Sequence, residues 1–105
     1  MKLRQLSVEE TGALVDELRG MSVLPAGANP STLARAKEIR FQLQGQNGVS
    51  PTAVEKADEV YREFEILFHP HRWREHEPLD SFRKEIKSSC DRLRAHLGLR
   101  ARPSV

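Results

Sequence analysis

The sequence is poor in cysteine and in aromatic residues, and it contains no long apolar run. Its single cysteine, Cys90, cannot form an internal disulfide and suits a reducing compartment, so we expect a cytosolic protein. No stretch approaches the roughly 18 consecutive apolar residues of a membrane-spanning helix, and the first residues carry no apolar signal-peptide core. Apolar and polar residues do not alternate along any segment, which argues against β-strands. We therefore expect a helical protein that does not enter a membrane.

The length of 105 residues fits a single helical domain with a modest core. We expect an N-terminal helix and connector over 1–30, a helical core over 31–98 and a flexible tail over 99–105. The net charge of +2 is distributed unevenly along the chain. Residues 51–71 contain two Lys or Arg and five Asp or Glu, whereas residues 72–105 contain nine and five. An acidic middle segment therefore precedes a basic C-terminal third.

Two helices are predicted in the first half of the chain. Ser7 forms a capping box with the glutamate three residues later and begins a helix over about 7–19. Gly20 is expected to end this helix in the left-handed conformation. Asn29-Pro30 begins the second helix, because a cap residue precedes a proline at the first helical position. The apolar stripe of the second helix consists of Leu33, Ala36, Ile39 and Leu43, and Phe41 lies off that stripe.

The second half of the chain predicts a longer helical hairpin. Ser50-Pro51 begins the third helix, and His69-Pro70 ends it because proline disfavours helical geometry in the residue before it. The fourth helix runs from about Leu79 to Gly98. Apolar residues at helical spacing should meet in the core: Tyr61, Phe64, Phe68, Phe82, Ile86, Cys90 and Leu93. The predicted fold class is all-α, a small antiparallel bundle of three or four helices.

Several features of the hairpin occur in a fixed order along the chain. Tyr61-Arg62 leads through Phe64 and Phe68 into His69-Pro70, and the loop is followed by Phe82 and by Lys84-Glu85-Ile86-Lys87. Because these features occur in this order, the segment of about residues 41–95 resembles a J domain, the co-chaperone module that stimulates the ATPase of a heat-shock chaperone. The resemblance implies a J-domain-like helical hairpin whose functional loop stands at an exposed tip.

Two departures from the family pattern weaken the expectation of ordinary J-domain activity. His71 stands where the family has an essential aspartate. The helix before the loop is acidic where the family presents basic residues, and it carries Glu55, Asp58, Glu59, Glu63 and Glu65. Like charges across an interface reduce affinity, so an acidic chaperone surface would be a poor partner. The resemblance thus implies a degenerate, chaperone-related scaffold that acts as an adaptor.

We expect the loop over 69–76 to bind a protein partner. The candidate residues are His69, Pro70, His71, Arg72, Trp73 and Arg74. Tryptophan and arginine are enriched among the residues that dominate binding energy. The predicted function is a non-catalytic protein-protein interaction module without a cofactor, and a second copy of the chain is one candidate partner.

A small DNA- or RNA-binding regulator is the alternative prediction. Arg83, Lys87 and Arg94 share one side of the fourth predicted helix, and Arg100 and Arg102 follow it. Such a basic face can follow phosphates, with an affinity that falls as the salt concentration rises. Acidic residues interrupt the face, however, and a solvated charged surface is the commoner outcome.

Metal binding and nucleophilic catalysis are weaker predictions. His69, His71 and His76 lie near two glutamates, but their spacings match no familiar zinc site, so we predict no metal centre. Cys90 falls on the apolar stripe of the fourth helix, where a free thiol packs as a small hydrophobic group. Catalysis through this thiol would need a nearby base, for which His69 is the candidate.

Overall fold

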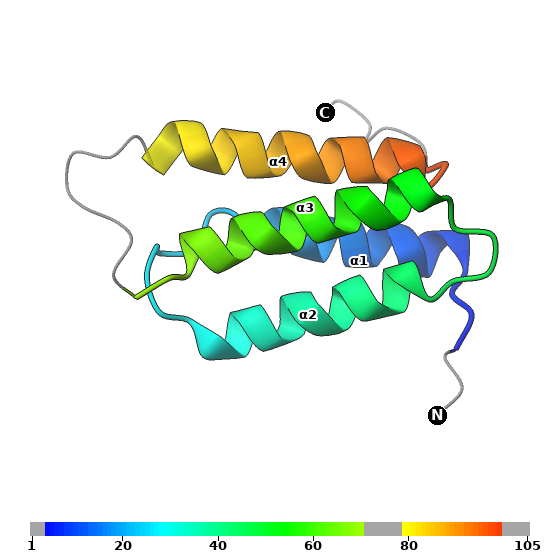
Figure 1. The fold of residues 1–105 in the computed structure, drawn as a ribbon, viewed down its shortest axis with the longest axis horizontal. Helices are drawn as coiled ribbons and strands as arrows, with labels where there is room; N and C mark the ends of the chain where they lie inside the picture. The colour runs from blue at the N-terminus through cyan, green and yellow to red at the C-terminus, as the bar shows by residue number, and fades with distance from the viewer. Residues whose placement is uncertain (1–3, 71–78, 100–105) are drawn as a thin grey trace.

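The computed structural model describes residues 4–70 and 79–99, which form four α-helices (Figure 1). The helices are α1 (Val8–Met21), α2 (Pro30–Gln44), α3 (Pro51–Leu67) and α4 (Leu79–His96). No strand occurs in these two ranges, and successive helices run antiparallel. The predicted all-α class and the antiparallel helical bundle are confirmed.

The first three helices begin at residues whose side chains accept a hydrogen bond from the backbone. Ser7 Oγ accepts from the Glu10 N–H at 3.1 Å, and Glu10 Oε1 accepts from the Ser7 N–H at 3.1 Å, which is the predicted capping box. Asn29 and Ser50 each accept from the N–H three residues later, at 3.3 and 3.0 Å. A proline follows each of these two caps, so the predicted helix starts are confirmed.

The end of α1 differs from the prediction. The helix continues through Gly20 to Met21, and Gly20 does not have the positive φ of a left-handed residue. Instead the buried Ser22 follows the helix, and its hydroxyl donates to the carbonyl of Arg19 at 2.7 Å. Because a side chain satisfies this carbonyl, a left-handed glycine is not needed, and the prediction for Gly20 was wrong. The predicted end of the fourth helix near Gly98 is confirmed, since α4 ends at His96 and Gly98 follows it with a left-handed φ of 74°.

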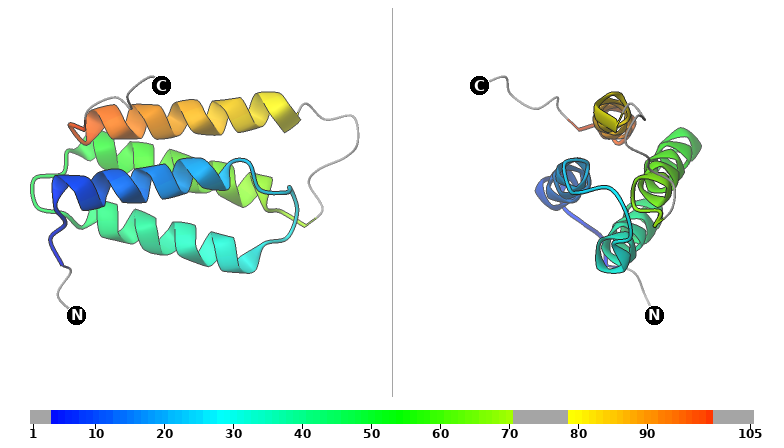
Figure 2. Two further views of the ribbon diagram at one scale, coloured as in Figure 1. Left: turned by 180° about the vertical axis from the view of Figure 1, so that it is seen from behind. Right: turned by 90° about the vertical axis from the view of Figure 1, so that its left-hand side faces the viewer.

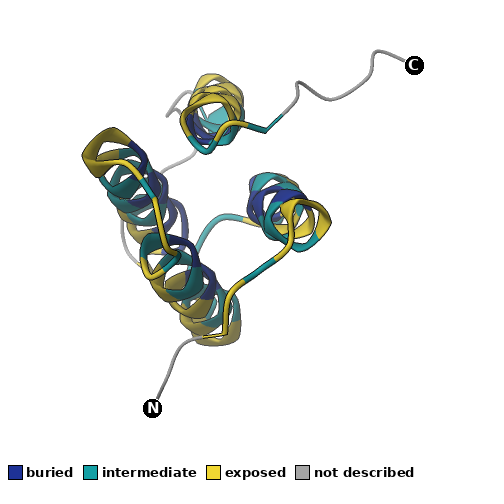
Figure 3. Cartoon of the chain, turned by 90° about the vertical axis from the view of Figure 1, so that its right-hand side faces the viewer, coloured by how far each residue is buried: buried dark blue, intermediate teal, exposed yellow. Residues whose placement is uncertain are grey.

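The four helices form a ring around one core (Figure 2). α3 packs most extensively against α4 and then against α2, while α1 closes the ring by contacting α4 and, least closely, α2. The buried apolar residues that form this core are Val15, Leu18, Met21, Ala36, Ile39, Leu43, Ala57, Val60, Phe64, Leu67, Phe68, Ile86, Cys90 and Leu93. They come from all four helices and lie on the inward sides, whereas the outward sides are exposed (Figure 3).

Most members of the predicted core are buried, and two of them are only half-buried. The buried members are Phe64, Phe68, Ile86, Cys90 and Leu93. The rings of Phe64 and Phe68 are stacked with their centroids 5.8 Å apart. Tyr61 and Phe82 are half-buried and pack against the core from its rim. The guanidinium of Arg40 covers Tyr61, with its Cζ 4.3 Å from the ring centroid.

Packing continues just beyond α4. Leu97 and Leu99 pack against the core, and the Leu99 N–H donates to the carbonyl of Arg94 at 3.1 Å. The predicted tail over 99–105 therefore begins with a packed residue, and residues 100–105 lie outside the described ranges. Within the described ranges, no helix combines the length and the apolar character needed to cross a bilayer.

Candidate functional site

The predicted partner-binding loop begins where α3 ends. Phe68 is buried, and its N–H donates to the carbonyl of Phe64 at 2.9 Å. The next two residues, His69 and Pro70, are exposed, and the His69 N–H donates to the carbonyl of Ile66 at 3.3 Å. The exposed pair is thus fixed to the end of a well-packed helix. The other predicted loop residues, His71, Arg72, Trp73 and Arg74, lie outside the described ranges.

The connector between α1 and α2, residues 22–29, lies at the same end of the bundle (Figure 1). The Gly27 N–H donates to the carbonyl of Leu67 at 3.0 Å, which joins the connector to α3. The Arg83 guanidinium donates to the carbonyl of Leu24 at 2.8 Å, which joins the connector to α4. Both helices of the hairpin therefore hold this connector in place.

Sequence reasoning missed the contribution of this connector to the site. Val23 is 59% exposed, and Pro25 and Ala28 are also exposed. In an antiparallel bundle the first and third connections lie at the same end, and that rule could have identified the connector as a neighbour of the loop. We call residues 23–29 together with His69 and Pro70 the loop-end surface.

The basic side of α4 is partly engaged within the bundle. Arg94 forms an ion pair with Asp16 of α1 at 3.3 Å. Arg83 lies 3.9 Å from Asp80, in addition to its bond to the connector. Lys87 is half-buried, and Arg100 and Arg102 lie outside the described ranges. Arg83 and Arg94 therefore help to hold α4 in the bundle, which leaves a less continuous basic face than the sequence suggests.

The α3–α4 interface contains a carboxyl group with an unsatisfied oxygen. Glu63 Oε1 is buried and has no hydrogen-bond partner among the residues that the structure describes. Burial is the main cause that raises the pKa of Glu63, and the carboxylates of Glu85 and Glu59 add to the rise. The Ser89 hydroxyl and the Arg92 guanidinium lower the pKa and offset part of the effect. The ionised form of Glu63 is therefore less favourable in the folded chain than in the unfolded chain.

Cys90 has the properties of a packing residue. Its side chain is fully buried. Burial raises the pKa of the Cys90 thiol to about 12, and the charges of Glu63 and Asp91 contribute to the rise. The thiol is protonated and inaccessible near neutral pH, whereas a nucleophilic cysteine needs an accessible thiolate.

Residues 4–70 and 79–99 contain no group of three His, Cys, Asp or Glu placed to hold a metal ion. His69 of the predicted histidine cluster is described, whereas His71 and His76 are not.

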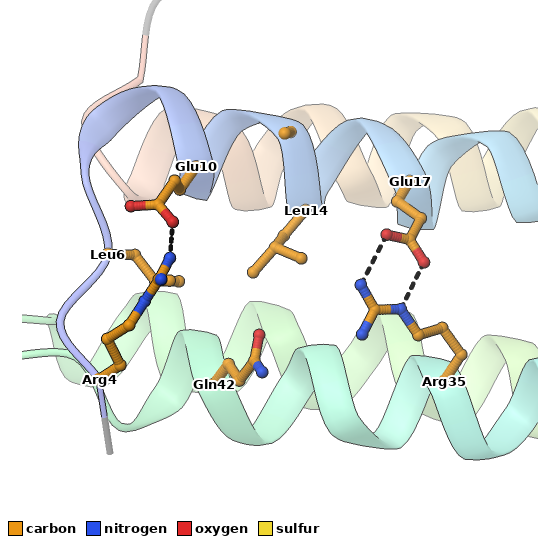
Figure 4. Close-up of a pocket in the computed structure, with 8 residues that line it drawn as sticks. Arg4, Leu6, Glu10, Leu14, Glu17, Arg35 and Gln42 are labelled. Carbon is orange, nitrogen blue, oxygen red and sulfur yellow. Dashed lines mark hydrogen bonds and ion pairs between the residues drawn. The ribbon is translucent and has the colours of Figure 1, made fainter.

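A groove of about 470 Å³ separates α1 from α2 (Figure 4). Leu14 points into its middle, and ion pairs cross it on both sides. Arg35 donates two hydrogen bonds to Glu17 at 2.6 and 2.9 Å, which lowers the pKa of Glu17. Arg4 pairs with Glu10 at the other side. The charges of these ion pairs neutralise one another, and the pair of Arg35 with Glu17 holds α1 and α2 together across the groove.

Comparisons of the chain with protein-family models, with curated proteins and with solved structures found no match. A function must therefore be inferred from the residues of this chain and their geometry.

Proposed function

We propose that this chain is a non-catalytic protein-interaction module that binds a protein partner through the loop-end surface and the adjoining loop to residue 76. The scaffold that we propose is a degenerate J-domain-like hairpin, used as a chaperone-related adaptor in the cytosol. The observation that carries the proposal is the exposure of His69 and Pro70 at the end of a rigid helix, beside a fixed connector with an exposed Val23. Binding residues are commonly found on loops that a rigid scaffold holds in position.

The charge of α3 indicates the chemistry of the partner. Glu55 and Glu65 are exposed on this helix together with the basic Arg62, whereas the basic Lys56 is engaged by Glu59 at 3.4 Å. An acidic helix beside the binding loop favours a partner with a basic contact surface and disfavours an acidic one. This is the reverse of the charge that J domains present to their chaperone, so we expect no stimulation of a heat-shock chaperone ATPase.

Capture of partners by the immobilised full-length chain tests the proposal. Combined substitution of His69, Pro70 and Trp73 with alanine should reduce capture by about tenfold or more, because aromatic residues in loops often dominate binding energy. Asn47→Ala, in the exposed turn at the opposite end of the bundle, should leave capture unchanged. Circular dichroism checks that all variants remain helical. Undiminished capture by the triple variant would contradict the proposed site.

Two further assays separate this proposal from its competitors. In gel shifts with duplex DNA and single-stranded RNA at roughly 50 and 200 mM salt, a nucleic-acid-binding protein would show binding that weakens as salt rises. If such binding occurred, Lys87→Glu would weaken it and reduce its dependence on salt. We expect no binding by the unchanged chain. In a chaperone ATPase assay, an unchanged hydrolysis rate is expected, and stimulation would show that ordinary J-domain activity is retained.

A further inference from the structure

α2 carries large apolar residues on two opposite sides. Ile39 and Leu43 are buried in the core, whereas Phe41 is 67% exposed. Since successive helical residues are about 100° apart, Phe41 lies roughly 200° around the helix from each of these core residues. Among the aromatic side chains in residues 4–70 and 79–99, Phe41 is the one that is mainly exposed. Within residues 4–70 and 79–99, the fold leaves this ring outside the core.

The surface around Phe41 is a groove of about 340 Å³ along the outer side of α2, lined by Ala34, Lys37, Glu38, Arg40, Phe41 and Gln44. Contacts with α3 fix one side of this groove. Arg40 stacks over Tyr61 at 4.3 Å, and the Gln44 amide donates to Asp58 Oδ1 at 2.9 Å. The other residues are all exposed and recur three or four positions apart: Ala34, Lys37, Glu38 and Phe41. We call these four residues the Phe41 stripe.

We propose that the Phe41 stripe binds a second copy of this chain, with the two α2 helices antiparallel about a two-fold axis. The order of residues in the stripe sets the register. When Phe41 lies opposite Ala34 of the second copy, Lys37 automatically lies opposite Glu38 of the second copy. The two-fold axis repeats both contacts, so each dimer contains two of each.

Both contacts in this register are complementary. A large aromatic ring meets a small side chain, which allows the helices to approach closely. An ammonium group meets a carboxylate: Glu38 accepts a bond from Arg35 at 2.6 Å, yet its side chain remains 58% exposed and accessible to a second cation. A parallel arrangement in register would instead place Lys37 opposite Lys37 and Phe41 opposite Phe41. The charge pattern therefore favours a second copy in the antiparallel orientation.

The contact should be weak because it involves one short helix from each copy. α2 contains 15 residues and is therefore about 22 Å long. A contact of this length lies below the standard size of stable protein interfaces, so we expect a dissociation constant on the order of 100 μM.

Sedimentation equilibrium of the full chain from about 10 μM to 1 mM tests the proposal, since this range brackets the expected dissociation constant. The chain should convert from monomer to dimer across this range. Phe41→Ser should raise the dissociation constant by about a hundredfold, because the dimer loses two buried rings. Val8→Ser removes another exposed apolar side chain, 73% exposed on α1, and should change nothing. A chain that stays monomeric throughout, or dimerises equally well with Phe41→Ser, overturns the proposal.

A charge exchange tests the register. Lys37→Glu or Glu38→Lys alone places like charges opposite each other and should weaken the dimer by about tenfold. The double variant Lys37→Glu/Glu38→Lys restores opposite charges and should recover the original dissociation constant. Glu65→Lys, an equivalent change on the exposed side of α3, is the matched control. Because all of these positions are exposed, unchanged thermal unfolding checks the folding of the variants. A double variant as weak as the single ones overturns the pairing of Lys37 with Glu38.

Discussion

The backbone N–H of Gly27 donates a hydrogen bond of 3.0 Å to the carbonyl of Leu67, which joins the α1–α2 connector to the last residue of α3. Gly27 has a φ of 113°, a conformation that residues with a Cβ atom rarely adopt. This conformation turns the connector back toward α3 and directs the N–H at the helix end. The shape of the loop-end surface therefore depends on a glycine at this position.

Gly27→Ala should destabilise the fold by about 1–2 kcal/mol, because alanine is strained at this positive φ. Gly20→Ala is the matched control: a Cβ at Gly20 would meet nothing within 4 Å, and the residue has an ordinary helical conformation. It should stabilise α1 by roughly 0.5–1 kcal/mol. Urea denaturation measures both free energies of unfolding. Changes of the same sign in the two variants would contradict the role given to Gly27.

Truncation of Phe64 should strongly destabilise the fold. This residue is fully buried and stacks on Phe68 at 5.8 Å. Phe64→Ala should cost about 3–5 kcal/mol, a large part of the 5–15 kcal/mol typical of a small protein. Phe41→Ala removes the same side chain from an exposed site and should change stability by less than about 0.5 kcal/mol. Thermal unfolding followed by circular dichroism compares the two variants, and similar midpoints would show that Phe64 is not a core residue.

Glu63 should make the stability of the fold depend on pH. Because its pKa is raised in the folded state, the folded chain binds this proton more readily than the unfolded chain. The protonated carboxyl therefore favours folding below the unfolded pKa, and this contribution is lost as the pH rises through the folded pKa. Glu63→Gln should raise the free energy of unfolding at pH 7.5 by about 1 kcal/mol, since it removes a half-buried charge.

The gain from Glu63→Gln should disappear below about pH 4, where the glutamic acid is itself neutral. Urea denaturation at the two pH values provides the measurement. Glu65→Gln, at an exposed position on the same helix, should give no such pH-dependent gain. Equal stabilisation by Glu63→Gln at both pH values would show that the effect does not come from removing a charge, and it would contradict the prediction.

The Cys90 thiol should react only when the helices open. It is fully buried, and its pKa is raised to about 12. At pH 8 a thiol-specific disulfide reagent should label the folded chain at least about a thousandfold more slowly than the chain in urea. Phe64→Ala should accelerate the labelling, because opening becomes easier. Rapid labelling of the folded, unchanged chain would contradict the burial of this residue.

Local signals in the sequence were sufficient for the starts of the first three helices. The caps at Ser7, Asn29 and Ser50 depend on bonds over three residues, so their spacing alone identifies the helix starts. The end of α1 was mispredicted because two local solutions compete there. A glycine can end a helix through its backbone, but Ser22 satisfies a carbonyl through its side chain, and sequence pattern does not rank the two.

The candidate site depends more strongly than the helix starts on contacts between segments that are distant in the sequence. Arg94 is part of a basic pattern in the sequence, yet its ion pair with Asp16 bridges 78 positions and is invisible to spacing arguments. The position of the connector beside His69 likewise follows from the antiparallel arrangement and not from its composition. In contrast, Phe41 off the apolar stripe was visible from helical periodicity alone, because it lies opposite Ile39.

Gln46 should hold the N-terminal segment against the bundle. Its Oε1 accepts from the Leu6 N–H at 2.7 Å, and its Nε2 donates to the carbonyls of Arg4 at 3.1 Å and Gln42 at 2.8 Å. One side-chain amide thus pairs with the backbone on both sides of residue 5. Because Leu6 lines the groove between α1 and α2, release of the segment should loosen the most weakly packed pair of neighbouring helices.

Gln46→Ala should therefore cost about 1–2 kcal/mol, since it leaves the partly buried Leu6 N–H without its acceptor. Hydrogen exchange should accelerate at Leu6, whereas the core amides of α4 should retain most of their protection. Asn47→Ala is the matched control in the same turn, because Asn47 bonds to Gln5 Oε1 through its backbone N–H at 2.9 Å and would keep this bond. Unchanged exchange at Leu6 in Gln46→Ala would show that the amide does not fasten the segment. Faster exchange throughout α4 would instead mean that this turn stabilises the whole bundle.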